Sequence, residues 1–172
     1  SDGQESWGTV GVSENLMDKI EDRLVKLDCC RMDTPHHANA VGAVLELVLL
    51  RYQEAEVAYR KAIELNPKYD SAWNGLGLTF NSQNRYQEGA AACRKAIEID
   101  SQNVHVWNNL GYALNGQKRY QEAETALRKA MEIDPQYVHA WNNLANALNA
   151  QNRHQEAETA YRKAIELDSE YA

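Results

Sequence analysis

The residues best placed to bind a ligand are asparagines that recur at regular intervals along the chain. They are Asn74, Asn108, Asn109 and Asn115, followed by Asn142, Asn143, Asn146 and Asn149. A side-chain amide carries both a donor and an acceptor, so it can pair with a peptide group in both directions. A row of such amides predicts non-covalent binding of an extended peptide through its backbone.

Ring side chains are interspersed among these amides. His105 and His139 share one position of the pattern, and Tyr112 lies between Asn109 and Asn115. Imidazoles can act as pH-sensitive groups or as metal ligands. We interpret these two as solvated polar residues at the edge of the amide-bearing face.

Other reactive residue types do not form a recognisable site. The pair Cys29–Cys30 precedes His36–His37, but the spacing matches no standard four-ligand zinc site, so we expect no metal and no cofactor. The sequence has no Gly-rich phosphate loop, no nucleophile elbow and no Glu-flanked His pair of the metalloprotease type. We therefore expect a binding protein and not an enzyme.

Composition restricts the kind of partner. The net charge is −7, and the Lys and Arg residues are dispersed, whereas a nucleic-acid backbone needs a concentrated basic face. The longest apolar run, Ala40–Leu50, contains Glu46 and is too short to span a bilayer. Three cysteines form no disulfide framework, and no secretory leader opens the sequence. We expect a cytoplasmic protein that binds neither nucleic acid nor membrane.

The amides recur because the sequence itself repeats. Val104–Tyr137 reappears almost unchanged as Val138–Tyr171 and more loosely as Asp70–Asn103. Tryptophan marks the same place in each copy at intervals of 34 residues, and a fixed period of this length indicates a repeat array.

Each copy contains two helical patterns joined by a polar turn. In Val104–Tyr137, an apolar stripe of Trp107, Leu110 and Leu114 marks the first helix, and the second ends at Asp134–Pro135. At about 100° per residue, the amides of the first helix project from the side opposite this stripe. The second helices carry Glu and Arg at four-residue spacing, which we interpret as a solvated charged face.

This pattern resembles the tetratricopeptide repeat: an aromatic residue, Leu-Gly, Ala, a second Ala and Pro. The resemblance covers residues 70–171 strongly and residues 51–69 at the level of the second helix. It implies an all-α, right-handed superhelical array of antiparallel helix pairs, whose first helices line a concave groove. Ser101 and Ser169 replace the usual Pro, and His154 replaces the usual turn Tyr.

The expected organisation follows the period. Residues 1–35 form an N-terminal tail and capping helix, with a helix over about 14–27. Residues 36–69 form a degenerate first repeat, and three full repeats cover 70–103, 104–137 and 138–172.

The amide row is similar to the asparagine ladder in the repeat region of O-GlcNAc transferase. Asn109 and Asn143 fall at the matching repeat position, but Val41 and Gly75 occupy it in the first two units, so the ladder is partial. Family members that bind acidic chaperone tails use a clamp of Lys and Arg, and the corresponding positions here carry neither. We therefore expect no carboxylate clamp.

The first repeat is irregular. Val41 and Val44 fall on the side where later units carry amides, and Glu46 falls in the stripe. No Gly, Asn or Pro separates the run ending at Leu50 from Arg51. Two alternatives follow: a rotated helix pair covered by the N-terminal helix, or one long helix over residues 38–65 that could exchange between two chains.

The sequence thus predicts a scaffold or adaptor that binds a partner's peptide segment in the concave groove. The predicted groove residues are Asn74, His105, Asn108, Asn109, Tyr112, Asn115, His139, Asn142, Asn143, Asn146 and Asn149. A second hypothesis is the substrate-docking region of a larger, glycosyltransferase-like enzyme. A third is a self-assembling array, with homo-oligomers formed through the apolar end near Tyr161 and Ile165 or through the irregular first repeat.

Overall fold

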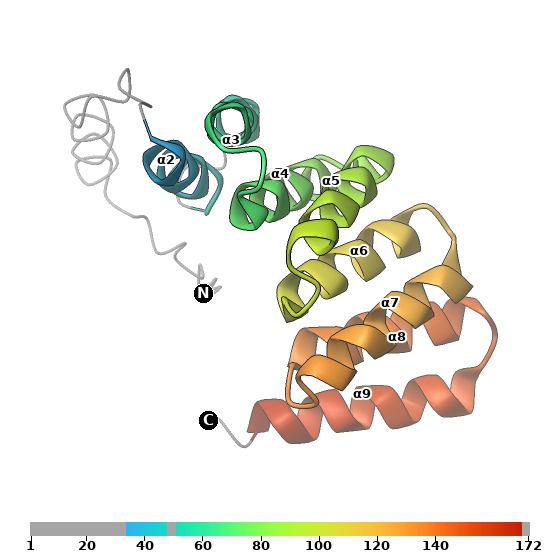
Figure 1. Cartoon of the computed structure of the whole chain (residues 1–172). Helices are drawn as coiled ribbons and strands as arrows, with labels where there is room; N and C mark the ends of the chain where they lie inside the picture. The colour runs from blue at the N-terminus through green and yellow to red at the C-terminus, as the bar shows by residue number, and fades with distance from the viewer. Residues whose placement is uncertain (1–33, 48–50, 170–172) are drawn as a thin grey trace, which may run out of the picture. The chain divides into compact units, whose positions relative to one another are not determined.

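The computed structural model describes residues 34–47 and 51–169, and every regular element within them is an α-helix (Figure 1). The helices are α2 (Pro35–Leu47), α3 (Tyr52–Leu65), α4 (Asp70–Ser82), α5 (Tyr86–Ile99), α6 (Val104–Gly116), α7 (Tyr120–Ile133), α8 (Val138–Ala150) and α9 (His154–Ser169). The predicted helix over 14–27 and the pair Cys29–Cys30 lie outside the described residues. None of the described helices offers an apolar stretch long enough to cross a membrane.

The helices pack in pairs, and the pairs stack in two layers. The first helices α2, α4, α6 and α8 each contact the next first helix, whereas α3, α5, α7 and α9 do not contact one another. We call these two sets the inner and outer helices. The described unit therefore curves with the inner helices on its concave side, which confirms the predicted all-α repeat array (Figure 1).

Each pair closes through contacts that recur from repeat to repeat. Leu110, Leu114 and Leu127 are at most 6% exposed and fill the space between α6 and α7. The turns between inner and outer helices contain Asn84, Lys118 and Asn152, whose φ angles of 60°, 61° and 62° reverse the chain. These left-handed residues set the angle at which each outer helix returns along its inner helix.

Tryptophan joins the inner helices α4, α6 and α8 to the loops before them. The indole Nε1 of Trp107 donates to the carbonyl oxygen of Ser101 at 2.9 Å, and that of Trp141 donates to Pro135 at 2.8 Å. Ser101 stands where the repeat usually has Pro, yet the bond is the same because only the backbone oxygen takes part. The departure at Ser101 therefore leaves the loop geometry intact.

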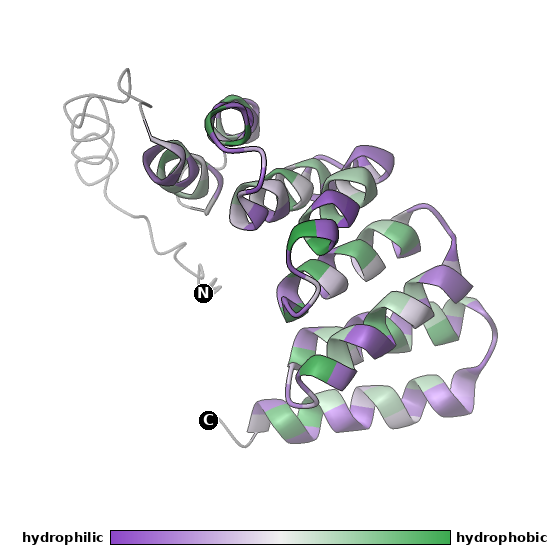
Figure 2. Cartoon of the chain, viewed as in Figure 1, coloured by the Kyte–Doolittle hydropathy of each residue, from purple (hydrophilic) through white to green (hydrophobic). Residues whose placement is uncertain are grey.

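The outer helices carry hydrophilic and hydrophobic residues in alternation, visible along α7 and α9 (Figure 2). Contrary to the expected solvated face, Glu124 is only 6% exposed. Its carboxylate pairs with Arg128 in its own helix at 2.6 Å and with Arg153 of the next repeat at 2.7 Å. Part of the charged stripe thus links adjacent repeats.

The irregular first repeat is a pair of helices, since α2 ends at Leu47 and α3 begins at Tyr52. Of the two alternatives for the first repeat, one long helix over 38–65 is therefore wrong. Glu46 of α2 is 3% exposed, and the Tyr59 hydroxyl of α3 donates to its Oε2 at 3.2 Å. The other oxygen, Oε1, has no hydrogen-bond partner. Burial raises the pKa of Glu46 to about 7, although the neighbouring hydroxyls of Thr79 and Tyr59 act in the opposite direction.

This raised pKa predicts that Glu46→Gln stabilises the protein above neutral pH. The folded state holds the Glu46 proton more tightly than the unfolded state, so its stabilising contribution is complete below pH 4.5 and is lost as the pH rises through about 7. Gln cannot ionise, so the free energy of unfolding should exceed that of the wild type by about 1–3 kcal/mol at pH 8. At pH 5 the two proteins should be nearly equal. Urea unfolding at both pH values measures the difference.

The matched control is Glu98→Gln, which neutralises an exposed carboxylate paired with Lys95. Its effect should be small at both pH values. A Glu46→Gln variant whose stability relative to the wild type is the same at pH 5 and pH 8 would show that Glu46 does not titrate in this range.

Candidate functional site

All the predicted groove residues lie on the inner helices, and the sequence places them there through the 34-residue period. Asn74 is on α4, five of the residues are on α6 and five are on α8. The start of α6 is set by Asn103, whose side chain accepts a hydrogen bond from the backbone amide of His105 at 3.1 Å. The structure therefore brings these residues together on adjacent helices.

Four of the amides pair across the junctions between repeats. Nδ2 of Asn109 donates to Oδ1 of Asn74 at 2.9 Å, which joins α6 to α4. Nδ2 of Asn143 donates to Oδ1 of Asn108 at 2.9 Å, which joins α8 to α6 in the same way. Each pair uses one donor and one acceptor, so it leaves one amide group of each partner for other contacts.

Two further amides bond to the backbone of the next inner helix. Nδ2 of Asn81 donates to the carbonyl oxygen of Asn109 at 3.0 Å. Asn115, one repeat later, donates to the carbonyl oxygen of Asn143 at 2.9 Å. Asn81 is 1% exposed and was not among the predicted groove residues. Asn81 lies 34 residues before Asn115 and so occupies the same position of the preceding repeat. This repeat position is the sequence signal for its role in the junction.

The structure corrects the placement of Asn108. The helical pattern put this residue on the open side of α6, but it is only 6% exposed. It lies in the junction because Asn143 of the next repeat donates to its side chain. Asn108 therefore joins two repeats and is not an open groove residue.

The amides of the last repeat are more open. Asn142, Asn146 and Asn149 are all exposed on α8. Oδ1 of Asn146 accepts from the Tyr161 hydroxyl at 2.5 Å, and Oδ1 of Asn149 lies 2.7 Å from Nδ1 of His154. The Asn142 side chain makes no hydrogen bond to the described residues. It is the amide whose donor and acceptor are both free.

Three rings gather where α6 and α8 begin. Nδ1 of His105 lies 3.1 Å from the Tyr137 hydroxyl, and the two rings meet edge to face with centroids 5.1 Å apart. The His139 ring also meets the Tyr137 ring edge to face, with centroids 5.4 Å apart. Both imidazoles are exposed, as the sequence predicts. The rings therefore present an aromatic surface at the edge of the amide-bearing helices.

Tyr112 occupies the middle of α6 and is 44% exposed. Its ring contacts Tyr86 of α5 edge to face, with centroids 6.0 Å apart. Tyr86 can lie there because Gly116 has no side chain; a Cβ at this position would come within 2.5 Å of the Tyr86 ring. Burial raises the pKa of Tyr112, and the neighbouring Tyr86 adds to the effect.

Two kinds of reactive group, a metal cluster and a thiolate, are not found among the residues that the structure describes. In residues 34–47 and 51–169, no three His, Cys, Asp or Glu side chains meet as a metal would require. Cys93 is fully buried, and burial raises the pKa of its thiol to about 12, so it is not a thiolate nucleophile. The chemistry that the inner helices offer is hydrogen bonding by amides and contact with rings.

Two family models, both described as tetratricopeptide repeat, match residues 42–104 and 104–170. Together they span most of the 172 residues and include every inner helix that carries an amide of the site. No curated protein sequence matches the chain significantly.

Solved structures of MamA share this architecture. One, "Crystal structure of MamA", is 16% identical with a TM-score of 0.73, and the match covers 96% of this chain and 98% of that chain. A MamA fragment from Desulfovibrio magneticus RS-1 is 19% identical with a TM-score of 0.73, covering 94% and 98%. "MamA MSR-1 C2" is 23% identical with a TM-score of 0.67, covering 80% and 79%. At these identities the likeness establishes a shared fold.

The junction bonds predict that Asn108→Ala destabilises the array. The substitution leaves the half-buried Asn143 amide without its acceptor, at a cost of about 1–2 kcal/mol in the free energy of unfolding. Asn142→Ala is the matched control. Asn142 directly precedes Asn143 in α8, but it is exposed and makes no such bond. It should change the stability by less than about 0.5 kcal/mol. Chemical denaturation of both variants measures the contrast, and equal losses would contradict the assigned role of Asn108.

Proposed function

Because the chain belongs to the tetratricopeptide-repeat family, we propose that it is a scaffold that binds an extended peptide segment of a partner protein. The peptide lies along the open side of the inner helices, which we call the inner face. Arrays of stacked repeats bind partners on such extended concave surfaces. The inner face consists of Asn74, His105, Asn109, Tyr112, His139, Asn142, Asn143, Asn146 and Asn149.

The observation that carries this proposal is the geometry of the amide pairs. Asn109 and Asn143 each donate through Nδ2 to the preceding inner helix, and their Oδ1 atoms accept no hydrogen bond from the described residues. These side chains are held in place before any ligand arrives, so binding orders few additional groups. Their free carbonyl oxygens supply acceptors for the backbone N–H groups of an extended chain.

The inner face offers a peptide two kinds of contact, one with an amide and one with an aromatic ring. Asn142 adds a free donor and acceptor on α8, and Tyr112 adds an exposed ring on α6. Amides that bond the peptide backbone tolerate many sequences, whereas an exposed tyrosine selects for an apolar or aromatic side chain. The ligand would therefore be centred on α6 and α8.

Replacing Asn142 and Tyr112 together tests the inner face. Linear peptides selected against the wild type from a random displayed library should bind the Asn142→Ala, Tyr112→Ala variant about tenfold more weakly, because two contacts of about 0.5–1.5 kcal/mol are lost. The matched control is Thr125→Ala with Thr159→Ala, which truncates two exposed side chains of the outer helices α7 and α9. Fluorescence anisotropy measures the affinities. Selected peptides that bind both double variants as tightly as the wild type would refute the proposal.

A second candidate function, self-association, is favoured by an exposed apolar residue of α9. Ile165 of α9 is 68% exposed, whereas the equivalent residues Ile97 and Met131 are half-buried by the following repeat. A second copy that covers Ile165 would restore this contact.

Replacing Ile165 with Lys tests the self-association. Sedimentation equilibrium should show a lower mass for Ile165→Lys than for the wild type at high protein concentration. Val57→Lys provides the control, because Val57 is 62% exposed but lies on α3. A wild type that is monomeric at all concentrations would exclude this function.

A further inference from the structure

Charged side chains of the described residues fall into two classes. Every glutamate of the outer helices pairs with an Arg or Lys within 4.0 Å. The aspartates Asp70, Asp100 and Asp134, by contrast, form no ion pair with the described residues. Their negative charge is therefore available to a ligand.

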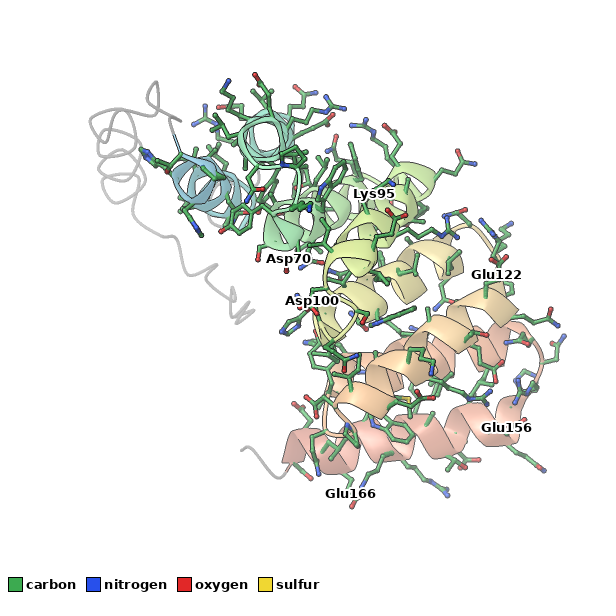
Figure 3. The ribbon with its side chains drawn as sticks, in the orientation of Figure 1. Asp70, Lys95, Asp100, Glu122, Glu156 and Glu166 are labelled. Atoms are coloured by element: carbon green, nitrogen blue, oxygen red, sulfur yellow. The ribbon has the colours of Figure 1, made fainter. Side chains whose placement is uncertain are left out.

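These aspartates lie together on one edge of the array, where the outer helices connect to the next inner helices. Asp100 and Asp134 are the C-cap residues that directly follow α5 and α7, and Asp70 is the first residue of α4. Figure 3 shows Asp70 and Asp100 on the side opposite to Glu122 and Glu156. We call the edge formed by the three aspartates the loop edge.

The charge of the loop edge is least compensated at its second and third loops. The first loop contains Lys68, but the equivalent residues of the next two loops are Gln102 and Gln136. One oxygen of each aspartate is occupied: Oδ1 of Asp100 accepts from the backbone amide of Gln102 at 2.8 Å, and Oδ1 of Asp134 accepts from Gln136 at 2.9 Å. The second oxygen of each carboxylate accepts no hydrogen bond from the described residues.

Ring side chains lie at the same edge as the carboxylates. The Tyr137 ring contacts those of His105 and His139, and Tyr137 follows Asp134 by three residues. Burial raises the pKa of Tyr137, and the charge of Asp134 raises it further. A carboxylate beside an aromatic ring attracts a cation through charge and through the ring quadrupole.

We propose that the peptide bound on the inner face is basic, with Lys or Arg side chains that reach the loop edge and bind at Asp100, Asp134 and Tyr137. This inference rests on the proposed function, because the inner face must hold the backbone of the same peptide. Extended chains place alternate side chains on opposite sides, so every second residue of the peptide points toward the loop edge. The net charge of −7 also favours the approach of a basic segment.

Three acetylated, fluorescently labelled peptides of equal length probe this inference. They alternate Ser with Lys, with Glu or with norleucine, and their affinities for the full chain are measured by anisotropy. The Ser–Lys peptide should bind most tightly, and its advantage over the norleucine peptide should shrink as the salt concentration rises. The Ser–Glu peptide should bind most weakly.

The decisive variant is Asp100→Asn with Asp134→Asn, which keeps the oxygen that accepts the backbone amide. The affinity for the Ser–Lys peptide should fall about 2- to 30-fold, because the variant loses two exposed charge contacts of about 0.2–1 kcal/mol each. The affinity for the norleucine peptide should not change. Glu122→Gln with Glu156→Gln changes the net charge equally, on the opposite edge, where each carboxylate is already paired with Arg. This control should weaken the Ser–Lys peptide much less.

If the aspartate variant and the glutamate control lower the affinity for the Ser–Lys peptide equally, net charge alone accounts for the binding and the inference is overturned. An unchanged affinity in the Asp100→Asn, Asp134→Asn variant would overturn it as well. If the norleucine peptide binds as tightly as the Ser–Lys peptide, and both lose affinity in the Asn142→Ala, Tyr112→Ala variant, the proposed function holds and the basic partner is wrong. If that inner-face variant binds all three peptides normally, the proposed function fails instead.

Discussion

Hydrogen bonds between amides of successive inner helices are the interaction on which the described array depends. The outer helices do not pack on one another, whereas each inner helix packs on both the preceding inner helix and the preceding outer helix. Asn109 and Asn143 bond the side chain of the preceding inner helix, and their own backbone oxygens accept from Asn81 and Asn115. Each junction is thus held through a side chain and through the backbone of the same residue. Loss of these buried hydrogen bonds would be costly, which fixes the register between repeats.

The first junction shows what happens where this pairing is absent. Gly75 occupies the position of Asn109 and Asn143, and a Cβ there would lie 2.3 Å from the Tyr59 ring. Tyr59 therefore takes the space that an amide would need, and its hydroxyl bonds the buried Glu46. The ladder is partial for a steric reason: one large ring from the outer helix replaces the amide pair. At the first junction, a tyrosine–glutamate contact that depends on pH thus stands in place of a neutral amide pair.

Most of the fold could be predicted from the sequence, because the stripe, the turns and the 34-residue period are local or repeated signals. The errors concern residues whose environment is supplied by another repeat. A helical pattern places Asn108 on the open side of α6, and only Asn143 from α8 reveals that this side is covered. Glu124 has the spacing of a solvated charge, yet Arg153 of the next repeat covers it. Periodicity describes the faces of one helix and does not show how near the neighbouring helix lies.

The double use of the amides explains why selective binding would need groups outside the ladder. The Nδ2 atoms of Asn109 and Asn143 already donate across the junctions, so each side chain offers a ligand one acceptor, its Oδ1 atom. Acceptors of this kind distinguish an extended backbone from a folded one, but they do not distinguish one sequence from another. Discrimination must come from side chains that the junctions do not use. The described array has these at the loop edge, where Asp100 and Asp134 have no cation of their own, and on α6, where Tyr112 is open.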